Sequence, residues 1–333
     1  MIINGRNYSK EELLRRCNPG IVYGARRVML TNGRGQGQKL VEVKTSAGLR
    51  ASFLEDRCLD ILDMEYKGIN LAFLSKNGVI SAALTYPDSD GFLKYWTGGF
   101  LSTCGLRNTG PSCCVDGEFF PLHGRIGLTP AEEVNVCVNA NEIIITGKVR
   151  ETALFGCNLE MERKITIPAD GAQITVNDII YNLAPEEETI FLLYHINFGF
   201  PFLSEELDIK FPEGDVKGRT DLAQQNIHHR AKFTPPIDGE PEVVFFYQPA
   251  EKNAKVTLTN QKLGIKASMC YDSLKLPVLS QWKCMRAGDY ALGIEPGTSF
   301  IRGRKEELEN GGGIKIPGFT QLEYGFTIIL DEI

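Results

Sequence analysis

Two of the four histidines in this chain of 333 residues stand in segments whose neighbours suggest a binding site. His123 and Arg125 are two residues apart in the segment Phe119–Gly127, so both side chains would lie on one face if that segment is extended. An imidazole can donate or accept a hydrogen bond, and a guanidinium offers a fixed fork of donors, which together suit the hydroxyl groups of a sugar. The alternative is a surface loop in which the arginine is structural.

His195 interrupts an apolar segment, Ile190–Phe200, which Pro201 follows directly. A buried imidazole costs free energy unless it is hydrogen-bonded, so His195 is either a paired core histidine or a site residue near a strand end. The residues alone favour the core histidine, because most buried polar groups are simply paired. The glycine and proline that follow mark the end of the strand and keep the second interpretation open.

Glu295 has a comparable position at the end of the predicted strand Tyr290–Glu295, before Pro296 and Gly297. A half-buried carboxyl group has a raised pKa and can act as a general base near neutral pH. The alternative is an exposed glutamate paired with Arg302 or Arg304. Trp282 lies on a strand that leads toward this glutamate, and its ring could face a sugar or fill the core.

The spacing of metal-ligating residues does not indicate a metal site. The nine cysteines include no Cys-x-x-Cys motif, and the adjacent His228 and His229 would point to opposite faces of an extended chain. The segment Gly33–Gly37 opens no helix and is a poor match to a phosphate-binding loop. We therefore expect neither a metal nor another cofactor. The odd number of cysteines, irregularly placed, is typical of reduced thiols.

The elements that must position these residues are predicted to be β-strands. The 34 glycines and 16 prolines are spread along the chain, which indicates many turns. Between residues 142 and 197, apolar and polar residues alternate in segments joined by Gly-containing turns, which predicts an antiparallel meander with one buried face. Further strands are predicted at residues 28–30, 39–44, 69–74, 79–85, 243–247, 255–260, 264–270, 290–295 and 320–330. The pattern predicts a large antiparallel β-sandwich.

Few segments depart from this β pattern. Ser9, followed by acidic and then basic residues up to Arg16, predicts a short helix near the N-terminus, the only clear helix in the sequence. The segments 211–241 and 303–318 are rich in Gly, Pro and charge without periodicity and are predicted to be loops. Long loops in compact domains are commonly functional.

Composition limits the classes of partner. The chain has 36 basic and 42 acidic residues, a net charge of −6, and no basic cluster, so nucleic acid is not an expected partner. The longest uncharged stretch, 189–204, contains polar residues, Gly and Pro, so we expect no membrane span. The N-terminus lacks the apolar core of a signal peptide, and a cytoplasmic location is expected.

An ordered set of short motifs between about residues 50 and 330 resembles the aldose 1-epimerase, or galactose mutarotase-like, superfamily, and in particular a poorly characterised bacterial branch. The matching segments are Arg57–Ile61, Gly98–Leu106, Leu122–Ile126, Tyr194–Gly199 and Trp282–Gly297. The resemblance implies an all-β fold, a β-supersandwich of large antiparallel sheets with an open saccharide cleft, preceded by the short N-terminal helix. It also implies a main domain at 46–333, with residues 1–45 as an N-terminal extension packed on it.

The resemblance further implies roles for individual residues. In mutarotases, a glutamate near the C-terminus takes the proton of the anomeric hydroxyl, and a histidine on a central strand protonates the ring oxygen; Glu295 and His195 match these positions. The implied sugar contacts are His123, Arg125, Asp221, Trp282, Asn197 and Arg57. Two departures concern the order Tyr194-His195-Ile196-Asn197, where mutarotases have Asn-His before an aromatic residue, and the proline after Glu295. These departures leave the identity of the sugar open.

The sequence therefore predicts a cofactor-independent, aldose 1-epimerase-like isomerase that interconverts anomers, or epimers, of a free sugar by acid/base ring opening. Its expected partner is a small sugar or sugar derivative, and its expected state is a monomer or a homodimer. Two alternatives remain at this stage: a carbohydrate-binding protein of the same fold without catalysis, and a sugar isomerase or lyase. Only an enzyme requires His195 and Glu295 to face one cleft within reach of a single ring.

Overall fold

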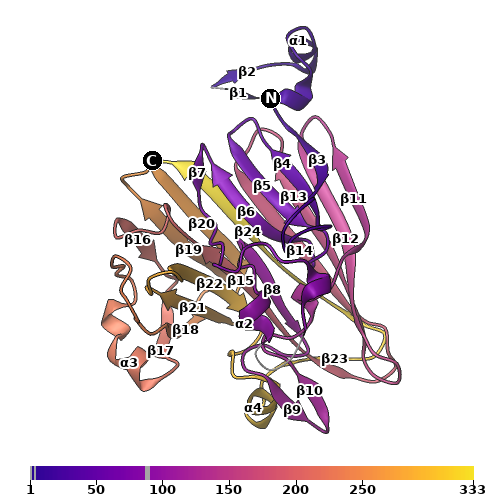
Figure 1. The fold of residues 1–333 in the computed structure, drawn as a ribbon, viewed down its shortest axis with the longest axis vertical. Helices are drawn as coiled ribbons and strands as arrows, with labels where there is room; N and C mark the ends of the chain where they lie inside the picture. The colour runs from indigo at the N-terminus through magenta and orange to yellow at the C-terminus, as the bar shows by residue number, and fades with distance from the viewer. Residues whose placement is uncertain (1, 4, 87–90) are drawn as a thin grey trace.

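The computed structural model describes residues 2–3, 5–86 and 91–333, and three antiparallel β-sheets make up its main body (Figure 1). The largest sheet has eight strands and contains the predicted meander. Its strands, in spatial order, are β11 (Glu132–Val138), β12 (Glu142–Thr152), β13 (Asn158–Pro168), β14 (Gln173–Asn182), β24 (Gln321–Glu332), β20 (Ile265–Asp272), β19 (Asn253–Asn260) and β16 (Leu207–Lys210).

The second sheet has seven strands and carries His195 and Glu295 on two neighbouring strands at its centre. Its main path consists of β17 (Gly214–Gly218), β18 (Val243–Pro249), β21 (Val278–Cys284), β22 (Ala291–Gly297), β15 (Glu188–Phe198) and β23 (Ile314–Ile316), and β8 (Leu101–Leu106) also pairs with β15. The long strand β15 is buried on both faces along most of its length, which explains its nearly continuous apolar sequence.

The third sheet is built from the N-terminal part of the chain. Its five strands are β3 (Gly24–Met29), β4 (Lys39–Lys44), β5 (Leu49–Leu54), β6 (Asp60–Tyr66) and β7 (Ile69–Asn70). The predicted domain boundary at residue 45 falls between β4 and β5, which pair with each other. The division of the chain at that point stays a prediction. Two small hairpins complete the strands: β1 (Ile2–Ile3) with β2 (Arg6–Asn7), and β9 (Cys113–Val115) with β10 (Glu118–Phe120).

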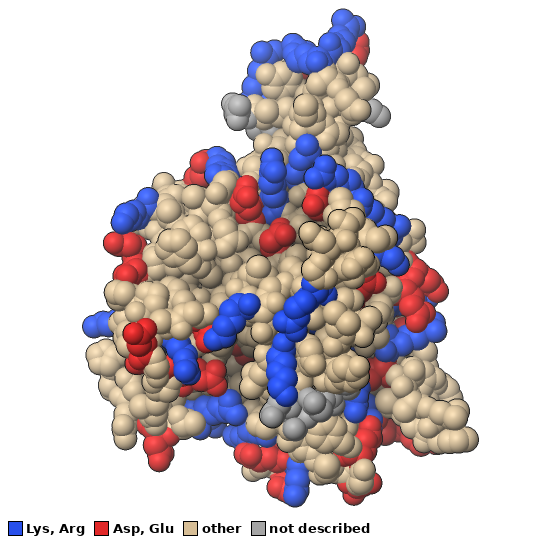
Figure 2. Space-filling view, in the orientation of Figure 1, with Lys and Arg blue, Asp and Glu red and all other residues tan. Residues whose placement is uncertain are grey.

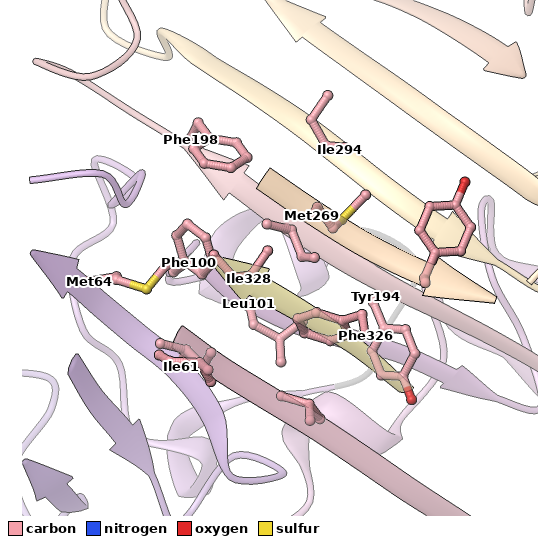
Figure 3. Close-up of a cluster of buried hydrophobic side chains, with 14 of the residues drawn as sticks. Ile61, Met64, Phe100, Leu101, Tyr194, Phe198, Met269, Ile294, Phe326 and Ile328 are labelled. Atoms are coloured by element: carbon pink, nitrogen blue, oxygen red, sulfur yellow. The ribbon is translucent and has the colours of Figure 1, made fainter. Parts of the chain in front are cut away.

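One hydrophobic core joins the three sheets. Figure 3 shows side chains from all of them in contact, among them Ile61 of β6, Tyr194 of β15 and Phe326 of β24. Alternate residues of β15, such as Tyr194, Ile196 and Phe198, face this core. The residues between them therefore face the opposite side of the seven-stranded sheet, because successive side chains of a strand alternate.

The short helices correct part of the sequence prediction. The predicted N-terminal helix exists as α1 (Lys10–Leu14), and the side chain of Ser9 caps it. Three further helices are present among the described residues: α2 (Gly91–Tyr95), α3 (Asp221–Gln225) and α4 (Arg304–Glu309). The segments predicted as loops at 211–241 and 303–318 contain β17 with α3 and α4 with β23, and the predicted strand at 79–85 contains a 3₁₀ turn, Ala82–Leu84. Elements of three to six residues are too short for periodicity to reveal them.

Charge of both signs is interspersed over the face seen in Figure 2, where Lys and Arg side chains also gather on the N-terminal projection at the top. Nowhere in the described residues is a helix long and apolar enough to cross a membrane.

Candidate active site

The register of β15 and β22 sets the central pair of the candidate site. Ile196 pairs with Ile294, so the adjacent residues His195 and Glu295 lie opposite each other on neighbouring strands. Both isoleucines pack in the main core, and the histidine and the glutamate therefore project from the other face of the sheet. Nε2 of His195 lies 3.3 Å from Oε1 of Glu295.

This pair is buried without full hydrogen bonding. His195 is 6% exposed and Glu295 is 1% exposed. Within the described residues, both carboxyl oxygens of Glu295 and Nδ1 of His195 have no hydrogen-bond partner, and the same is true of Oγ of Ser280, which pairs with Glu295 from β21. Unsatisfied buried polar atoms are rare in folded proteins because each costs free energy, so this cluster marks a place prepared for a polar ligand.

Burial also sets the protonation of the pair. It raises the pKa of Glu295 well above its usual range; the nearby carboxylate of Glu242 acts in the same direction, and Arg219 opposes both. Burial lowers the pKa of His195 to about 4, against a smaller opposite effect of the Asn197 amide. Burial thus favours the uncharged form of both groups, a protonated carboxyl group beside a neutral imidazole.

His123 lies beside His195, on a tight loop that packs against β8. Its backbone has a φ of 59° and the next residue, Gly124, has a φ of 76°. A Cβ on Gly124 would lie 2.1 Å from the carbonyl oxygen of Gly105, so only glycine permits this close contact with β8. Nδ1 of His123 accepts a hydrogen bond from the backbone N–H of Gly110, which leaves the proton on Nε2. Burial lowers the pKa of His123 to about 3, and the charges of His195 and Arg219 act in the same direction.

Aromatic rings surround the two histidines. The centroid of the Trp96 ring lies 5.2 Å from that of His195, and the centroid of the Trp282 ring lies 5.6 Å from it. Phe92 lies 5.0 Å from His123. The indole N–H groups are hydrogen-bonded, to Ser102 for Trp96 and to Glu242 for Trp282. Both tryptophans of the chain are thus fixed at this site.

These residues line one cavity of about 260 Å³. Four residues predicted from the sequence are brought together there: His123, His195, Trp282 and Glu295. The remaining lining residues are Phe92, Leu93, Trp96, Gly110, Pro111, Leu122, Arg219, Glu242, Val244 and Ile301.

Sequence reasoning missed four polar or aromatic residues of this cavity, namely Phe92, Trp96, Arg219 and Glu242. Trp96 had a usable signal, since it is one of two tryptophans and stands two residues before the matching segment Gly98–Leu106. Arg219 and Glu242 lie within or next to the stretch 211–241, which carries no periodicity and gave no reason to choose them.

The expectation of an extended segment at His123 and Arg125 is wrong, because His123 adopts a left-handed backbone conformation. Consequently the two side chains do not share a face. Arg125 donates to the carbonyl of Phe119 at 3.0 Å and does not line the cavity.

Three other implied sugar contacts also lie outside the cavity lining. Asn197 is buried, and its amide donates to the carbonyls of Gly99 and His195. Arg57 donates twice to the carbonyl of Ile80. Asp221 is exposed at the first position of α3. Asn197 and Arg57 therefore support the backbone around the site, and Asp221 lies two residues beyond the cavity residue Arg219.

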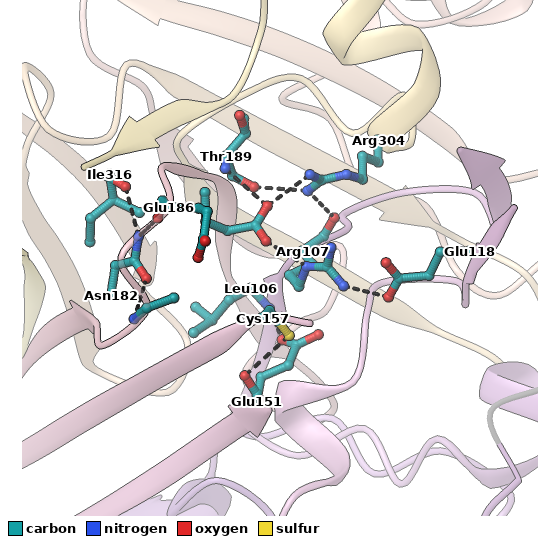
Figure 4. A network of polar contacts seen from close by, with 12 residues as sticks. Leu106, Arg107, Glu118, Glu151, Cys157, Asn182, Glu186, Thr189, Arg304 and Ile316 are labelled. Carbon is teal, nitrogen blue, oxygen red and sulfur yellow. Dashed lines mark hydrogen bonds and ion pairs between the residues drawn. The ribbon is translucent and has the colours of Figure 1, made fainter. Parts of the chain in front are cut away.

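A polar network surrounds the end of β8, the strand against which the His123 loop packs (Figure 4). Arg107 at the end of β8 forms ion pairs with Glu118 of β10 and with Glu188 of β15. Arg304 of α4 donates to the same Glu188 and to the backbone carbonyl of Arg107. Glu151 of β12 accepts the backbone N–H of Leu106 at 2.7 Å. The end of β8 is thus joined to the β9–β10 hairpin, to the eight-stranded sheet and to α4.

Among residues 2–3, 5–86 and 91–333, no group of three or more His, Cys, Asp and Glu side chains is arranged to hold a metal ion. The expectation of a metal-free and cofactor-free protein stays a prediction.

Solved structures with the same architecture define the class of protein. A structure from Klebsiella pneumoniae subsp. pneumoniae MGH 78578, provisionally described as an aldose 1-epimerase, has 25% sequence identity and a TM-score of 0.87, with 92% of this chain and 83% of that chain covered. A galactose mutarotase-like protein from Clostridium acetobutylicum has 13% identity and a TM-score of 0.69, with 94% and 100% covered. Galactose 1-epimerase from Lactobacillus acidophilus NCFM has 9% identity and a TM-score of 0.63, with 93% and 99% covered.

The chain therefore has the galactose mutarotase-like β-sandwich fold, as the resemblance predicted. Within that class it belongs to the family of the domain of unknown function DUF4432, whose model matches residues 35–330. None of the curated proteins matches the chain in sequence.

Proposed function

We propose that this protein is an aldose 1-epimerase-like isomerase, which interconverts the anomers of a sugar by opening and closing its ring. The observation that carries the proposal is the pair of His195 and Glu295, opposed at 3.3 Å in a cavity and left without hydrogen-bond partners for three of their polar atoms. The fold shared with an aldose 1-epimerase and with mutarotase-like proteins supports a substrate of the sugar class.

His195 and Glu295 have one transferable proton between them, and ring opening in mutarotation requires only one proton from the protein. Ring opening requires a proton donor to the ring oxygen and an acceptor for the proton of the anomeric hydroxyl. These two oxygens are bonded to the same carbon, so two catalytic groups that are neighbours can reach both. Closure on the other face of the carbonyl reverses the two transfers and restores the pair, so no co-reactant is consumed.

Burial favours one distribution of roles in this pair. The resemblance implied a carboxylate base and an imidazolium acid, which would place the proton on His195. The raised pKa of Glu295 and the lowered pKa of His195 support a proton on the carboxyl group instead. In our proposal Glu295 is therefore the donor in ring opening and His195 the acceptor, and the roles exchange in ring closure.

The other lining residues suit the remainder of a sugar. Nε2–H of His123 is free to donate to a hydroxyl group, because Nδ1 is already hydrogen-bonded to Gly110. The rings of Trp96 and Trp282 offer apolar surface for the C–H bonds of the sugar while their N–H groups are bonded elsewhere. The cavity is of a size for one ring and its substituents.

The test is anomer exchange measured by NMR across a panel of aldoses, ketoses and uronates. Glu295→Gln keeps the shape of the side chain but removes its proton transfer, so we expect exchange to fall by about 10² to 10⁴. Sugar binding should weaken much less. Glu206→Gln is a matched control, since Glu206 is exposed outside the cavity.

Full exchange in Glu295→Gln would exclude the carboxyl group from catalysis. Binding of a sugar by the unaltered protein without exchange would favour the carbohydrate-binding protein, and conversion to a product other than the second anomer would favour the isomerase or lyase.

A further inference from the structure

A second cavity adjoins the catalytic cavity and has a different character. It has a volume of about 350 Å³ and shares the lining residues Pro111 and Arg219 with the catalytic cavity. Its other lining residues are Lys217, Gly218, Phe246, Arg302 and Glu306. Three of its side chains are thus cations, although the chain as a whole has a net charge of −6. A molecule seated at His195 and Glu295 would have this basic cavity beside it.

Two of the cations are free to bind a ligand. Lys217 and Arg219 are two residues apart at the end of β17, so their side chains leave the chain on the same side. In the part of the chain that the structure describes, neither has an ion pair or a side-chain hydrogen bond. Nζ of Lys217 lies 4.4 Å from the centroid of the Phe300 ring. This contact with the face of the Phe300 ring occupies none of the three N–H donors of the Lys217 ammonium group.

The third cation, Arg302, lies over the same aromatic ring, with Cζ 4.4 Å from its centroid. Its nearest carboxylate is that of Glu306, at 3.6 Å from Nε, which is too far for a hydrogen bond. The Phe300 ring packs in turn on Phe246, another lining residue of the cavity. The aromatic pair of Phe300 and Phe246 therefore holds Lys217 and Arg302 toward the same cavity.

The backbone that carries Lys217 and Arg219 is firmly placed. The backbone N–H of Gly218 donates to Oε1 of Gln224 in α3 at 2.8 Å, and a Cβ on Gly218 would lie 2.2 Å from the backbone nitrogen of Gln224. Thr220 caps the N-terminus of α3 through its hydroxyl group. Because the strand end and the helix are locked together, little backbone entropy remains to be lost when a ligand binds, and the remaining cost is that of ordering the exposed Lys217 and Arg219 side chains.

The charge of the cavity matches a doubly charged anion. Three cations and the carboxylate of Glu306 leave two positive charges. A phosphate monoester carries a charge of about −1.5 to −2 at neutral pH, and arginine and lysine are its usual protein partners. Two other carboxyl groups lie near this cavity. Glu242 lines the catalytic cavity and accepts a hydrogen bond from the indole N–H of Trp282. Glu307 is buried near Arg302 and Lys217, and burial raises its pKa to about 7.

We propose that the basic cavity of Lys217, Arg219 and Arg302 binds the phosphoryl group of the substrate, so that the sugar interconverted at His195 and Glu295 is an aldose phosphate. This inference rests on the proposed function. It specifies the position of the phosphoryl group as well, because mutarotation requires a free anomeric hydroxyl group. The phosphoryl group must therefore stand away from the anomeric carbon, at the end of the sugar that faces Arg219.

The first experiment probes the cation cluster alone with inorganic phosphate, measured by isothermal titration calorimetry at low ionic strength. We expect saturable binding that weakens about tenfold or more in Arg219→Ala and in Lys217→Ala. Lys255→Ala is the matched control, since it removes one exposed lysine from β19, away from both cavities, and should bind phosphate as the unaltered protein does. Binding that is absent, or equal in all four proteins, would overturn the proposal.

The second experiment compares sugars that differ in one substituent: glucose, glucuronate and glucose 6-phosphate, with ribose and ribose 5-phosphate as a pentose set. We expect the phosphorylated sugar of at least one set to exchange anomers with a kcat/KM about 10²-fold above that of its neutral partner, and Arg302→Ala to raise its KM more than it changes kcat. Equal or faster exchange of neutral sugars or of the uronate would overturn the phosphate assignment while the proposed function stands. Binding of sugar phosphates at this cavity without any exchange would leave the phosphate site standing and refute the proposed function.

Discussion

Glu295 shows how a functional group can oppose stability at the scale of one residue. Its side chain is 1% exposed, its two oxygens have no hydrogen-bond partner among the described residues, and Oε1 lies 3.3 Å from Nε2 of His195. A structural carboxyl group in the same place would be expected to gain partners, because an unsatisfied buried polar atom costs about 1 to 3 kcal/mol. The arrangement is explained if a ligand supplies the missing hydrogen bonds.

Replacing Glu295 by Gln should stabilise the protein in a pH-dependent way. The folded state holds the carboxyl proton more tightly than the unfolded state, since burial raises the pKa above its ordinary value of 4.5. Stability is therefore lost as pH rises from 4.5 toward the folded-state pKa, by up to about 1.4 kcal/mol for each pH unit. Glutamine does not titrate, so the advantage of the variant should be near its minimum below pH 4.5 and should grow toward pH 8. Denaturant unfolding at several pH values measures it, and a pH-independent difference would contradict the raised pKa.

The pH profile of anomer exchange should extend further to the acid side than a free imidazole allows. His195 accepts a proton only while it is neutral, and its pKa is lowered to about 4. His123, which faces it, has a pKa of about 3 and stays neutral over the same range. We expect kcat/KM to be nearly constant between pH 6.5 and 5, where an unperturbed histidine would become protonated. A fall in kcat/KM centred near pH 6.5 would instead show that the His195 imidazole is solvated during the reaction.

At the scale of elements, long regular strands were predictable and short irregular ones were not. The meander of β12 to β14 follows directly from apolar alternation, because one face of each strand is buried against the core. The loop of His123 and Arg125 has no such pattern, and its extended conformation was predicted wrongly. Its geometry depends on the contact of Gly124 with Gly105, a relation between distant parts of the chain that no local pattern contains.

The candidate site was predictable to the extent that its residues interrupt regular strands. His195 and Glu295 stand out as polar residues in apolar strands, and the motif resemblance singled them out together. Arg219 follows the edge strand β17, whose five residues are mostly exposed and show no apolar alternation. Its place in the cavity depends on the pairing of β17 with β18, which brings it beside Val244.

A prediction for β22 concerns Gly293, which makes room for the catalytic carboxyl group two residues on. A Cβ at this position would lie 2.2 Å from Oε1 of Glu295 and 3.0 Å from Cβ of Trp282. Gly293→Ala should therefore displace the carboxyl group and lower anomer exchange by about 10²-fold, the effect expected of a small misplacement. The fold should persist, as judged by circular dichroism and by a cooperative unfolding transition. Unchanged exchange in a folded variant would mean that the carboxyl group works in another position.

At the scale of the whole molecule, a buried ionic cluster ties the sheets together beneath the site. Arg163 of β13, whose side chain is 0% exposed, donates to Asp178 of β14, Asp60 of β6 and Thr103 of β8. Tyr194, the neighbour of His195 on β15, donates to the same Asp178 at 2.8 Å. One guanidinium thus links the eight-stranded sheet to β6 and β8, and Asp178 extends the link to β15, the strand of the candidate site residue His195. The guanidinium also compensates two carboxylates that are excluded from water.

Replacing Arg163 by Met should destabilise the whole fold, because it leaves Asp60 and Asp178 buried without their cation. Loss of one partner of a buried ion pair costs about 3 to 5 kcal/mol, whereas an exposed pair contributes about 1 kcal/mol or less. Arg26→Met is the matched control, since Arg26 is paired with Glu42 on the surface.

Even beside Arg163, burial raises the pKa of Asp60 to about 6, and without the guanidinium it should rise further. The loss in Arg163→Met should consequently be largest at pH 8 and shrink as the pH falls and the carboxyl groups take up protons. Denaturant unfolding at pH 8 and pH 5 decides the matter: losses of equal size in the two variants, or a loss in Arg163→Met that grows toward pH 5, would show that the cluster does not hold the sheets together by charge.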